Sequence, residues 1–134
     1  MKRVNLSKSK KSINVINDQI GSPTSANDLA ECILKIIDST RFSYYAQEKS
    51  IFNFCNSGSC SWYEFAKEIL LLTSSDCDIC PITTDEYNAP AERPKYSVLN
   101  TSKIKASFDL KINSWQAALQ NTINSTNTNY NKSI

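Results

Sequence analysis

Two segments of the chain carry the spacing Tyr-x-x-x-Lys, which could support proton transfer. Tyr45 precedes Lys49, and Tyr63 precedes Lys67. On a helix, residues four apart lie on one face, so the lysine ammonium can lower the pKa of the tyrosine hydroxyl and prepare it for proton transfer. The spacing arises easily by chance, and no dinucleotide-binding fingerprint precedes either copy. We therefore interpret both pairs as structural or solvent-exposed and assign no catalytic residue.

The composition excludes much of the remaining enzyme chemistry. The 134 residues include no histidine, which excludes Ser-His and Cys-His catalysis and every His-ligated metal site. The two glycines, Gly21 and Gly58, cannot form a glycine-rich phosphate loop, so we expect this chain to bind no nicotinamide cofactor. A net charge of +2 indicates no particular acidic partner, and we expect no nucleic acid. The length suits one domain, and 40% hydrophobic residues are typical of a globular protein.

The five cysteines leave a metal site open as an alternative. Four of them are spaced as Cys-x4-Cys and Cys-x2-Cys and could supply zinc thiolates: Cys55, Cys60, Cys77 and Cys80. Against zinc, no glycine follows either pair to form the turn of a zinc knuckle, so we assign no metal ligand. The odd number of cysteines disfavours a closed disulfide framework and favours reduced thiols in the cytoplasm.

The chain shows no sign of a membrane or secretion segment. The basic start has no apolar stretch behind it and is not a signal peptide. The longest apolar run, residues 69–72, is far too short to cross a bilayer. We therefore expect no membrane partner.

Two segments are better candidates for binding than for catalysis. Residues 19–24 form a turn directly before a predicted helix, where free amides and the helix dipole favour an anion or a sugar hydroxyl. Arg93 lies on a loop with prolines nearby, which suits a guanidinium that meets phosphate oxygens. One such bond contributes on the order of 1.5–3 kcal/mol. A surface salt bridge is the alternative role for Arg93.

The pattern of residues predicts an α/β chain in which strands and helices alternate. We expect a poorly matched lead-in over 1–12, a globular part over 13–123 and a disordered tail over 124–134. Predicted strands cover 13–17, 51–55 and 78–82, with a brief extended segment over 96–99. Predicted helices cover 25–39, 62–73, about 101–108 and 115–123, with loops over 41–50 and 83–94.

Helical spacing also predicts which side chains face the core. The second helix begins with a capping box, in which Ser61 is the N-cap and Glu64 is at N3. The inward stripes we expect are Leu29, Cys32, Ile33, Ile36 and Ile37 in the first helix, Phe65, Ile69 and Leu72 in the second, and Trp115, Leu119 and Ile123 in the last.

Four segments taken together resemble one known family. They begin Asn14-Val15-Ile16-Asn17-Asp18-Gln19-Ile20-Gly21-Ser22-Pro23-Thr24, Asn56-Ser57-Gly58-Ser59-Cys60-Ser61-Trp62, Pro81-Ile82-Thr83-Thr84 and Arg93-Pro94-Lys95-Tyr96-Ser97-Val98-Leu99. In this order they resemble the substrate-binding half of dTDP-4-dehydrorhamnose reductases, which are extended short-chain dehydrogenases. The resemblance runs from about residue 13 to 119. It implies the C-terminal, substrate-binding lobe of a Rossmann-type enzyme without its N-terminal dinucleotide-binding half.

The resemblance also implies what such a lobe would do. Members of the family reduce dTDP-4-dehydro-L-rhamnose to dTDP-L-rhamnose with NADH or NADPH, for surface polysaccharide. Their glycine fingerprint and catalytic residues lie in the other half, so we expect a C-terminal fragment that is inactive alone and a separate reductase half as a partner. The dTDP-sugar would contact Gln19, Gly21, Ser22, Thr24 and Arg93. The alternatives are a non-catalytic nucleotide-sugar-binding or regulatory module of the same fold and the zinc protein above.

Overall fold

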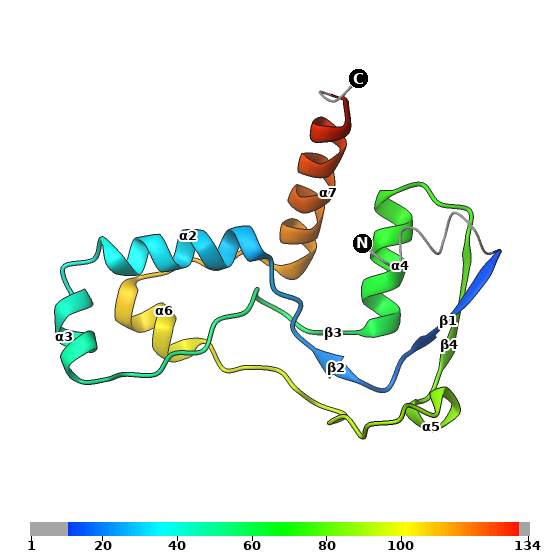
Figure 1. Ribbon diagram of the computed structural model, residues 1–134, viewed down its shortest axis with the longest axis horizontal. Helices are drawn as coiled ribbons and strands as arrows, with labels where there is room; N and C mark the ends of the chain where they lie inside the picture. The colour runs from blue at the N-terminus through cyan, green and yellow to red at the C-terminus, as the bar shows by residue number, and fades with distance from the viewer. Residues whose placement is uncertain (1–10, 132–134) are drawn as a thin grey trace.

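The computed structural model describes residues 11–131, so the lead-in that we expected over 1–12 lies almost entirely outside the described residues. The chain mixes strands and helices, which confirms the α/β class, but the two do not alternate strictly, since β1 and β2 are consecutive and three helices follow β4 (Figure 1). The elements are β1 (Ser12–Ile16), β2 (Ile20–Gly21), α2 (Ala26–Ile37), α3 (Phe42–Gln47), β3 (Cys60–Ser61), α4 (Trp62–Leu72), β4 (Asp78–Ile82), α5 (Thr84–Tyr87), α6 (Ser102–Phe108) and α7 (Trp115–Asn131). None of the helices within the described residues is long and apolar enough to cross a membrane.

One end of the molecule is a two-stranded parallel sheet with α4 packed beside it. β1 and β4 pair from Ser12 opposite Asp78 to Ile16 opposite Ile82, and the Asn17 amide donates to the Ile82 carbonyl at 2.9 Å. This confirms the predicted strands over 13–17 and 78–82. Figure 1 shows α4 between the sheet and α7, the position of a helix that connects parallel strands. The side chains that β1 buries are Val15 and Ile16.

A second, very short pair of strands lies in the middle of the molecule and positions the segments that flank it. Ile20 pairs with Ser61, and Gly21 with Cys60, in antiparallel register. The other side of Ile20 receives the extended segment near Tyr96, because the Ser97 amide donates to the Ile20 carbonyl at 2.9 Å. Three segments distant in sequence therefore meet at β2.

Both long predicted helices begin at a side-chain cap, and the cap of α4 is the predicted capping box. The Asp28 amide donates to the Ser25 hydroxyl at 3.3 Å at the start of α2. The capping box of α4 is complete, since the Glu64 amide donates to Ser61 Oγ at 3.0 Å and the Ser61 amide donates to Glu64 Oε2 at 2.7 Å. Each cap satisfies amides that have no partner inside the helix.

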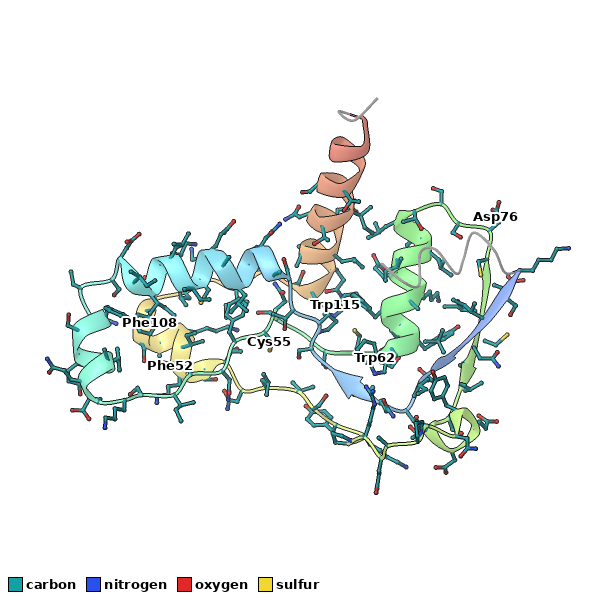
Figure 2. All side chains as sticks on the ribbon, viewed as in Figure 1. Phe52, Cys55, Trp62, Asp76, Phe108 and Trp115 are labelled. Carbon is teal, nitrogen blue, oxygen red and sulfur yellow. The ribbon has the colours of Figure 1, made fainter. Side chains whose placement is uncertain are left out.

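The other end of the molecule is an aromatic cluster between α3 and α6 (Figure 2). The ring of Tyr45 lies 5.3 Å from that of Phe52 and 5.2 Å from that of Phe108, centroid to centroid. Residues 51–55 form no strand: Phe52 packs into this cluster, and none of the described segments pairs with the backbone there. The predicted loops over 41–50 and 83–94 each contain a short helix, α3 and α5.

Two further expectations need correction. Of the face that we expected α2 to bury, Cys32 alone is fully buried, and Ile33 and Ile37 are about half exposed, because no described element covers that side of the helix. The tail that we expected to be disordered over 124–134 continues α7 as far as Asn131. Hydroxyls there bond back to the helix, as Ser125 does to the Asn121 carbonyl at 2.8 Å. Residues 132–134 lie outside the described residues.

Candidate functional site

A cleft of about 370 Å³ lies where β2, β3, the start of α4 and the segment over 93–99 come together; we call it the central cleft. Four of the five predicted binding residues border it: Gln19, Gly21, Ser22 and Arg93. They arrive there from two segments more than seventy positions apart in sequence, brought together by the pairing at Ile20. The structure thus gathers the residues that the sequence singled out.

Thr24, the fifth predicted residue, does not border the central cleft. It is exposed and borders a separate recess next to α7, with Asn56 and Trp115. Its hydroxyl donates to the Ser22 carbonyl at 3.4 Å. Thr24 therefore supports the turn rather than lining the cleft.

A second hollow of about 360 Å³, which we call the outer recess, lies beside β1 and the loop after α5. Three residues border both hollows: Gln19, Trp62 and Arg93. A ligand with two parts, such as a nucleotide joined to a sugar, could contact these three from either side.

The side chain of Gln19 is held by a hydrogen bond to Thr84, which is itself bonded to Asp18. Its side-chain amide donates from Nε2 to Thr84 Oγ1 at 3.1 Å, and the side chain is only 5% exposed. The Thr84 hydroxyl and amide both donate to Asp18 Oδ1, at 2.7 and 2.9 Å. These bonds connect the turn before β2 to the N-terminus of α5.

The same hydrogen bonds set the charge of Asp18. The hydroxyl of Thr84 has the largest effect and lowers the pKa of the Asp18 carboxyl below its usual value. Burial, the next largest effect, raises this pKa, while the Thr84 amide and Lys95 lower it further. Asp18 is therefore a carboxylate at neutral pH, and a carboxylate only accepts hydrogen bonds.

Gly21 and Ser22 shape the wall of the central cleft. A Cβ at Gly21 would lie 3.0 Å from Ser97 Oγ, so the absence of a side chain lets the two segments approach closely. The Ser22 hydroxyl donates to the Gly58 carbonyl at 2.8 Å and fastens the turn to the loop before β3.

Arg93 is exposed, and its guanidinium has no hydrogen-bond or ion-pair partner among residues 11–131. Within the described part of the chain, Arg93 thus forms no surface salt bridge, which was the alternative role. The donors of the guanidinium have no partner among the described residues, and a planar fork of this kind matches the oxygens of a phosphate.

Trp62 was missed as a site residue. Its indole is 45% exposed although it is the first residue of an amphipathic helix, and it borders both hollows. Figure 2 shows Trp62 at the end of α4 nearest β2. Trp62 continues the helical spacing of Phe65, Ile69 and Leu72, so the pattern alone places it on the inward face and gives no signal that its indole is exposed.

The structure does not bring the four candidate zinc ligands together. Within residues 11–131, no group of three or more metal-ligating side chains is close enough to hold an ion. Figure 2 shows Cys55 in the middle of the molecule and Asp76, the neighbour of Cys77, at the far end of the sheet. Burial, with a smaller effect from Glu64, raises the pKa of the Cys60 thiol to about 11 and disfavours the thiolate that zinc needs.

The two Tyr-x-x-x-Lys pairs do not form a proton-transfer site. Tyr45 packs in the aromatic cluster, and Lys49 lies beyond the end of α3 with a φ of 48°, so the pair does not share a helix face. Tyr63 and Lys67 both lie on α4, but neither borders the central cleft or the outer recess.

The described residues do not fit a dinucleotide cofactor. Such a cofactor needs a glycine-rich turn between a strand and the N-terminus of a helix. Here β1 is followed by β2 rather than by a helix, Gly21 lies in β2, and Gly58 packs against Trp115.

Comparison with known proteins identifies the family. The RmlD substrate binding domain matches over residues 1–128. The spore coat polysaccharide biosynthesis protein SpsK of Bacillus subtilis is 36% identical over 86% of this chain and 38% of its own length. The structure of a dTDP-4-dehydrorhamnose reductase from Clostridium acetobutylicum is 36% identical with a TM-score of 0.81, over 94% of this chain and 42% of that one.

A second reductase structure, from Bacillus anthracis in complex with NADP, is 34% identical with a TM-score of 0.80, over 90% of this chain and 40% of that one. The chain thus spans about two fifths of the length of these relatives. Its α/β fold is that of the Rossmann-type extended short-chain dehydrogenases that these structures represent. The chain belongs to the RmlD substrate-binding domain family.

Proposed function

We propose that this chain is the nucleotide-sugar-binding part of a dTDP-4-dehydrorhamnose reductase, which converts dTDP-4-dehydro-L-rhamnose to dTDP-L-rhamnose for polysaccharide synthesis. The observation that carries the proposal is the central cleft, where Gln19, Gly21, Ser22 and Arg93 meet. The names of the relatives support the choice of substrate.

The residues of the cleft divide the binding of such a ligand between them. Arg93 donates to the diphosphate, where two charges on the ligand meet a guanidinium without another partner among the described residues. Trp62 and Phe65 offer flat apolar surfaces to a ring of the ligand. Gly21 leaves the backbone accessible, and Gln19 offers a polar group at the boundary of the two hollows.

We assign the redox step to groups outside this chain. A nicotinamide supplies the hydride when it is bound. Because the described residues offer no cradle for it and no tyrosine with a lysine partner beside the cleft, the chain alone binds and orients the sugar and excludes water from it. A separate reductase part is then the partner that brings cofactor and proton donor. The five unpaired cysteines support a reducing compartment, the cytoplasm.

Calorimetric titration with dTDP-L-rhamnose tests the binding role. We expect binding by the chain, and a loss of about 10- to 100-fold in affinity for Arg93→Ala, the size of one charge-assisted hydrogen bond. Lys111→Ala, which removes one positive charge from an exposed loop position away from both hollows, is the matched control. Equal effects of the two substitutions would reduce the role of Arg93 to general electrostatic attraction.

An activity assay tests the assignment of the redox step. We expect no NADPH oxidation by the purified chain with the keto-sugar, and oxidation when a dinucleotide-binding half from a relative is added. If the chain binds the dTDP-sugar but never supports reduction in such mixtures, the non-catalytic nucleotide-sugar-binding module is the better description. NADPH oxidation by the chain alone would overturn the assignment.

A further inference from the structure

A chain of hydrogen bonds through Thr84 determines which end of the Gln19 side-chain amide, the NH₂ or the carbonyl, faces Thr84. The Thr84 hydroxyl stands between two groups: Asp18 Oδ1 is 2.7 Å away, and Gln19 Nε2 is 3.1 Å away. The backbone amide of Thr84 also donates to Asp18, at 2.9 Å, which keeps the hydroxyl in register with the carboxylate.

Counting protons determines the direction of each bond. A hydroxyl has one proton to donate, and an ionised carboxylate has none. The proton of Thr84 therefore goes to Asp18, and the Thr84 oxygen is left as an acceptor. The group of Gln19 that contacts this oxygen must be a donor, so it is the NH₂ group rather than the carbonyl. The charge of Asp18 thus sets the orientation of the Gln19 side-chain amide, to which it is connected by two hydrogen bonds through Thr84.

The carbonyl oxygen of Gln19 is then left without a partner. Among the described residues, nothing donates a hydrogen bond to Gln19 Oε1, although only 5% of Gln19 is exposed. Buried side-chain acceptors are normally satisfied. Gln19 borders both the central cleft and the outer recess, so a molecule in either hollow can reach it.

We infer that Gln19 presents its carbonyl oxygen to the bound ligand as a hydrogen-bond acceptor, that the ligand supplies a donor there, and that Asp18 and Thr84 are positioning residues for this contact. The identity of the ligand as a dTDP-sugar rests on the proposed function. Three parts of such a ligand carry a suitable donor: the ring N–H of the thymine base, the 3′-hydroxyl of the deoxyribose and the hydroxyls of the rhamnose. A ligand that presents only acceptors at this point is rejected, because two acceptors would face each other.

Three variants test separately the carbonyl oxygen of Gln19 and the Thr84 hydroxyl that orients it. Gln19→Met keeps the length of the side chain and removes both polar atoms. Thr84→Val keeps the shape of the threonine and removes the hydroxyl, which frees the amide of Gln19 to turn over. Thr84→Ser retains the hydroxyl and is the matched control. A role of Thr84 in the fold alone would appear in thermal unfolding, so unfolding is measured for each variant beside ligand affinity.

Affinities for dTDP-L-rhamnose and for dTDP are then compared. We expect Gln19→Met and Thr84→Val to weaken binding of dTDP-L-rhamnose about 5- to 30-fold, and Thr84→Ser to bind within about 2-fold of the parent chain. A loss confined to dTDP-L-rhamnose assigns the donor to a hydroxyl of the rhamnose. An equal loss for dTDP assigns it to the nucleoside, whose donors are the thymine N–H and the deoxyribose 3′-hydroxyl. Both results support the inference.

Other results would overturn it. If both variants bind as the parent chain does while Arg93→Ala is weakened, Gln19 makes no ligand contact and the proposed function still stands. If the parent chain binds neither ligand, the proposed function fails and the inference fails with it. Should Thr84→Val not fold, the side-chain amide of Gln19 in the parent chain is observed by NMR. A slowly exchanging NH₂ supports its bond to Thr84, and free exchange contradicts it.

Discussion

Gly58 lies against the indole of Trp115, so that a Cβ on the glycine would come within 3.2 Å of Trp115 Cδ1. The φ of Gly58 is +88°, a conformation that residues with a side chain rarely adopt. The carbonyl of the same glycine accepts the hydroxyl of Ser22, a residue of the central cleft. Gly58 therefore contacts both the first residue of α7 and a residue that lines the central cleft.

Substitution of that glycine tests the connection. We expect Gly58→Ala to lower the free energy of unfolding by about 1–3 kcal/mol, because alanine is strained at this positive φ and the indole must move. Urea denaturation followed by circular dichroism measures it. Ser59→Ala, at an exposed position in the same turn, is the control and should stay within about 0.5 kcal/mol of the parent chain. An unchanged midpoint for Gly58→Ala would contradict the strained conformation.

Asn56 joins three segments from a buried position. Its side chain is 1% exposed, accepts from the Ser25 amide at 2.7 Å, and donates to Asp28 and to the Asn113 carbonyl. We expect Asn56→Ala to cost about 2–3 kcal/mol of stability, since it leaves buried partners unsatisfied. The same urea experiment checks this value. Asn53→Ala, an exposed asparagine of the same segment, should be nearly neutral, and a similar loss in both would contradict the role of Asn56.

The buried thiol of Cys60 should be unreactive where an exposed one is not. Its pKa is raised to about 11, chiefly by burial, whereas Cys80 is exposed. We expect a disulfide reagent at pH 8 to label Cys80 rapidly and Cys60 only when the chain unfolds. Mass spectrometry of digested protein assigns the label. Cys80→Ser should abolish the fast phase, and rapid labelling of Cys60 in the folded chain would show that its environment is not as described.

The raised pKa of Cys60 also has a consequence for stability. A thiol whose pKa is higher in the folded chain than in the unfolded one stabilises the fold fully below the unfolded value and loses that contribution as pH rises through about 11. We expect the free energy of unfolding to fall between about pH 9 and 11 more steeply in the parent chain than in Cys60→Ala. Parallel slopes for the two proteins would be the contrary result.

The carboxyl of Asp18 offers a test at acid pH. Its pKa is lowered, first by the hydroxyl of Thr84, so the carboxylate stabilises the fold above the unfolded pKa of about 3.9, and this contribution is lost as pH falls through the lower folded value. We expect Thr84→Val to raise the pKa of Asp18 toward its ordinary value and Thr84→Ser to leave it low. Titration of the Asp18 side chain by NMR measures both, and an unchanged midpoint in Thr84→Val would exclude the hydroxyl as the cause.

Local rules predicted the parts of the fold that depend on neighbouring residues. The cap of α2 at Ser25 and the capping box of α4 follow from side chains that reach amides three positions away. The strands β1 and β4 follow from their β-branched and apolar residues. The wrong strand over 51–55 had the same local pattern, but strands exist only with a partner, and the partner is not written in the segment itself.

Most of the residues predicted to bind the ligand lie at the candidate site, but the hydrogen bonds that connect them to other segments were not predicted. The turn over 19–24 and Arg93 were singled out from local chemistry and from a family resemblance, and the structure brings four of the five residues to one cleft. The bonds of Gln19 to Thr84 and of Thr84 to Asp18 span about 65 positions of sequence, which no local rule addresses. Trp62 was missed for a related reason, because its exposure depends on which elements leave it uncovered.

The most direct test of the binding role is an NMR titration of the isotope-labelled chain with dTDP-L-rhamnose. We expect the backbone amides of Gly21, Ser22 and Ser97 around the central cleft to shift progressively with added ligand. Amides of the aromatic cluster around Phe108, which lies at the opposite end of the molecule, should not shift (Figure 2). Shifts confined to that end, or no shift at millimolar ligand, would contradict the account.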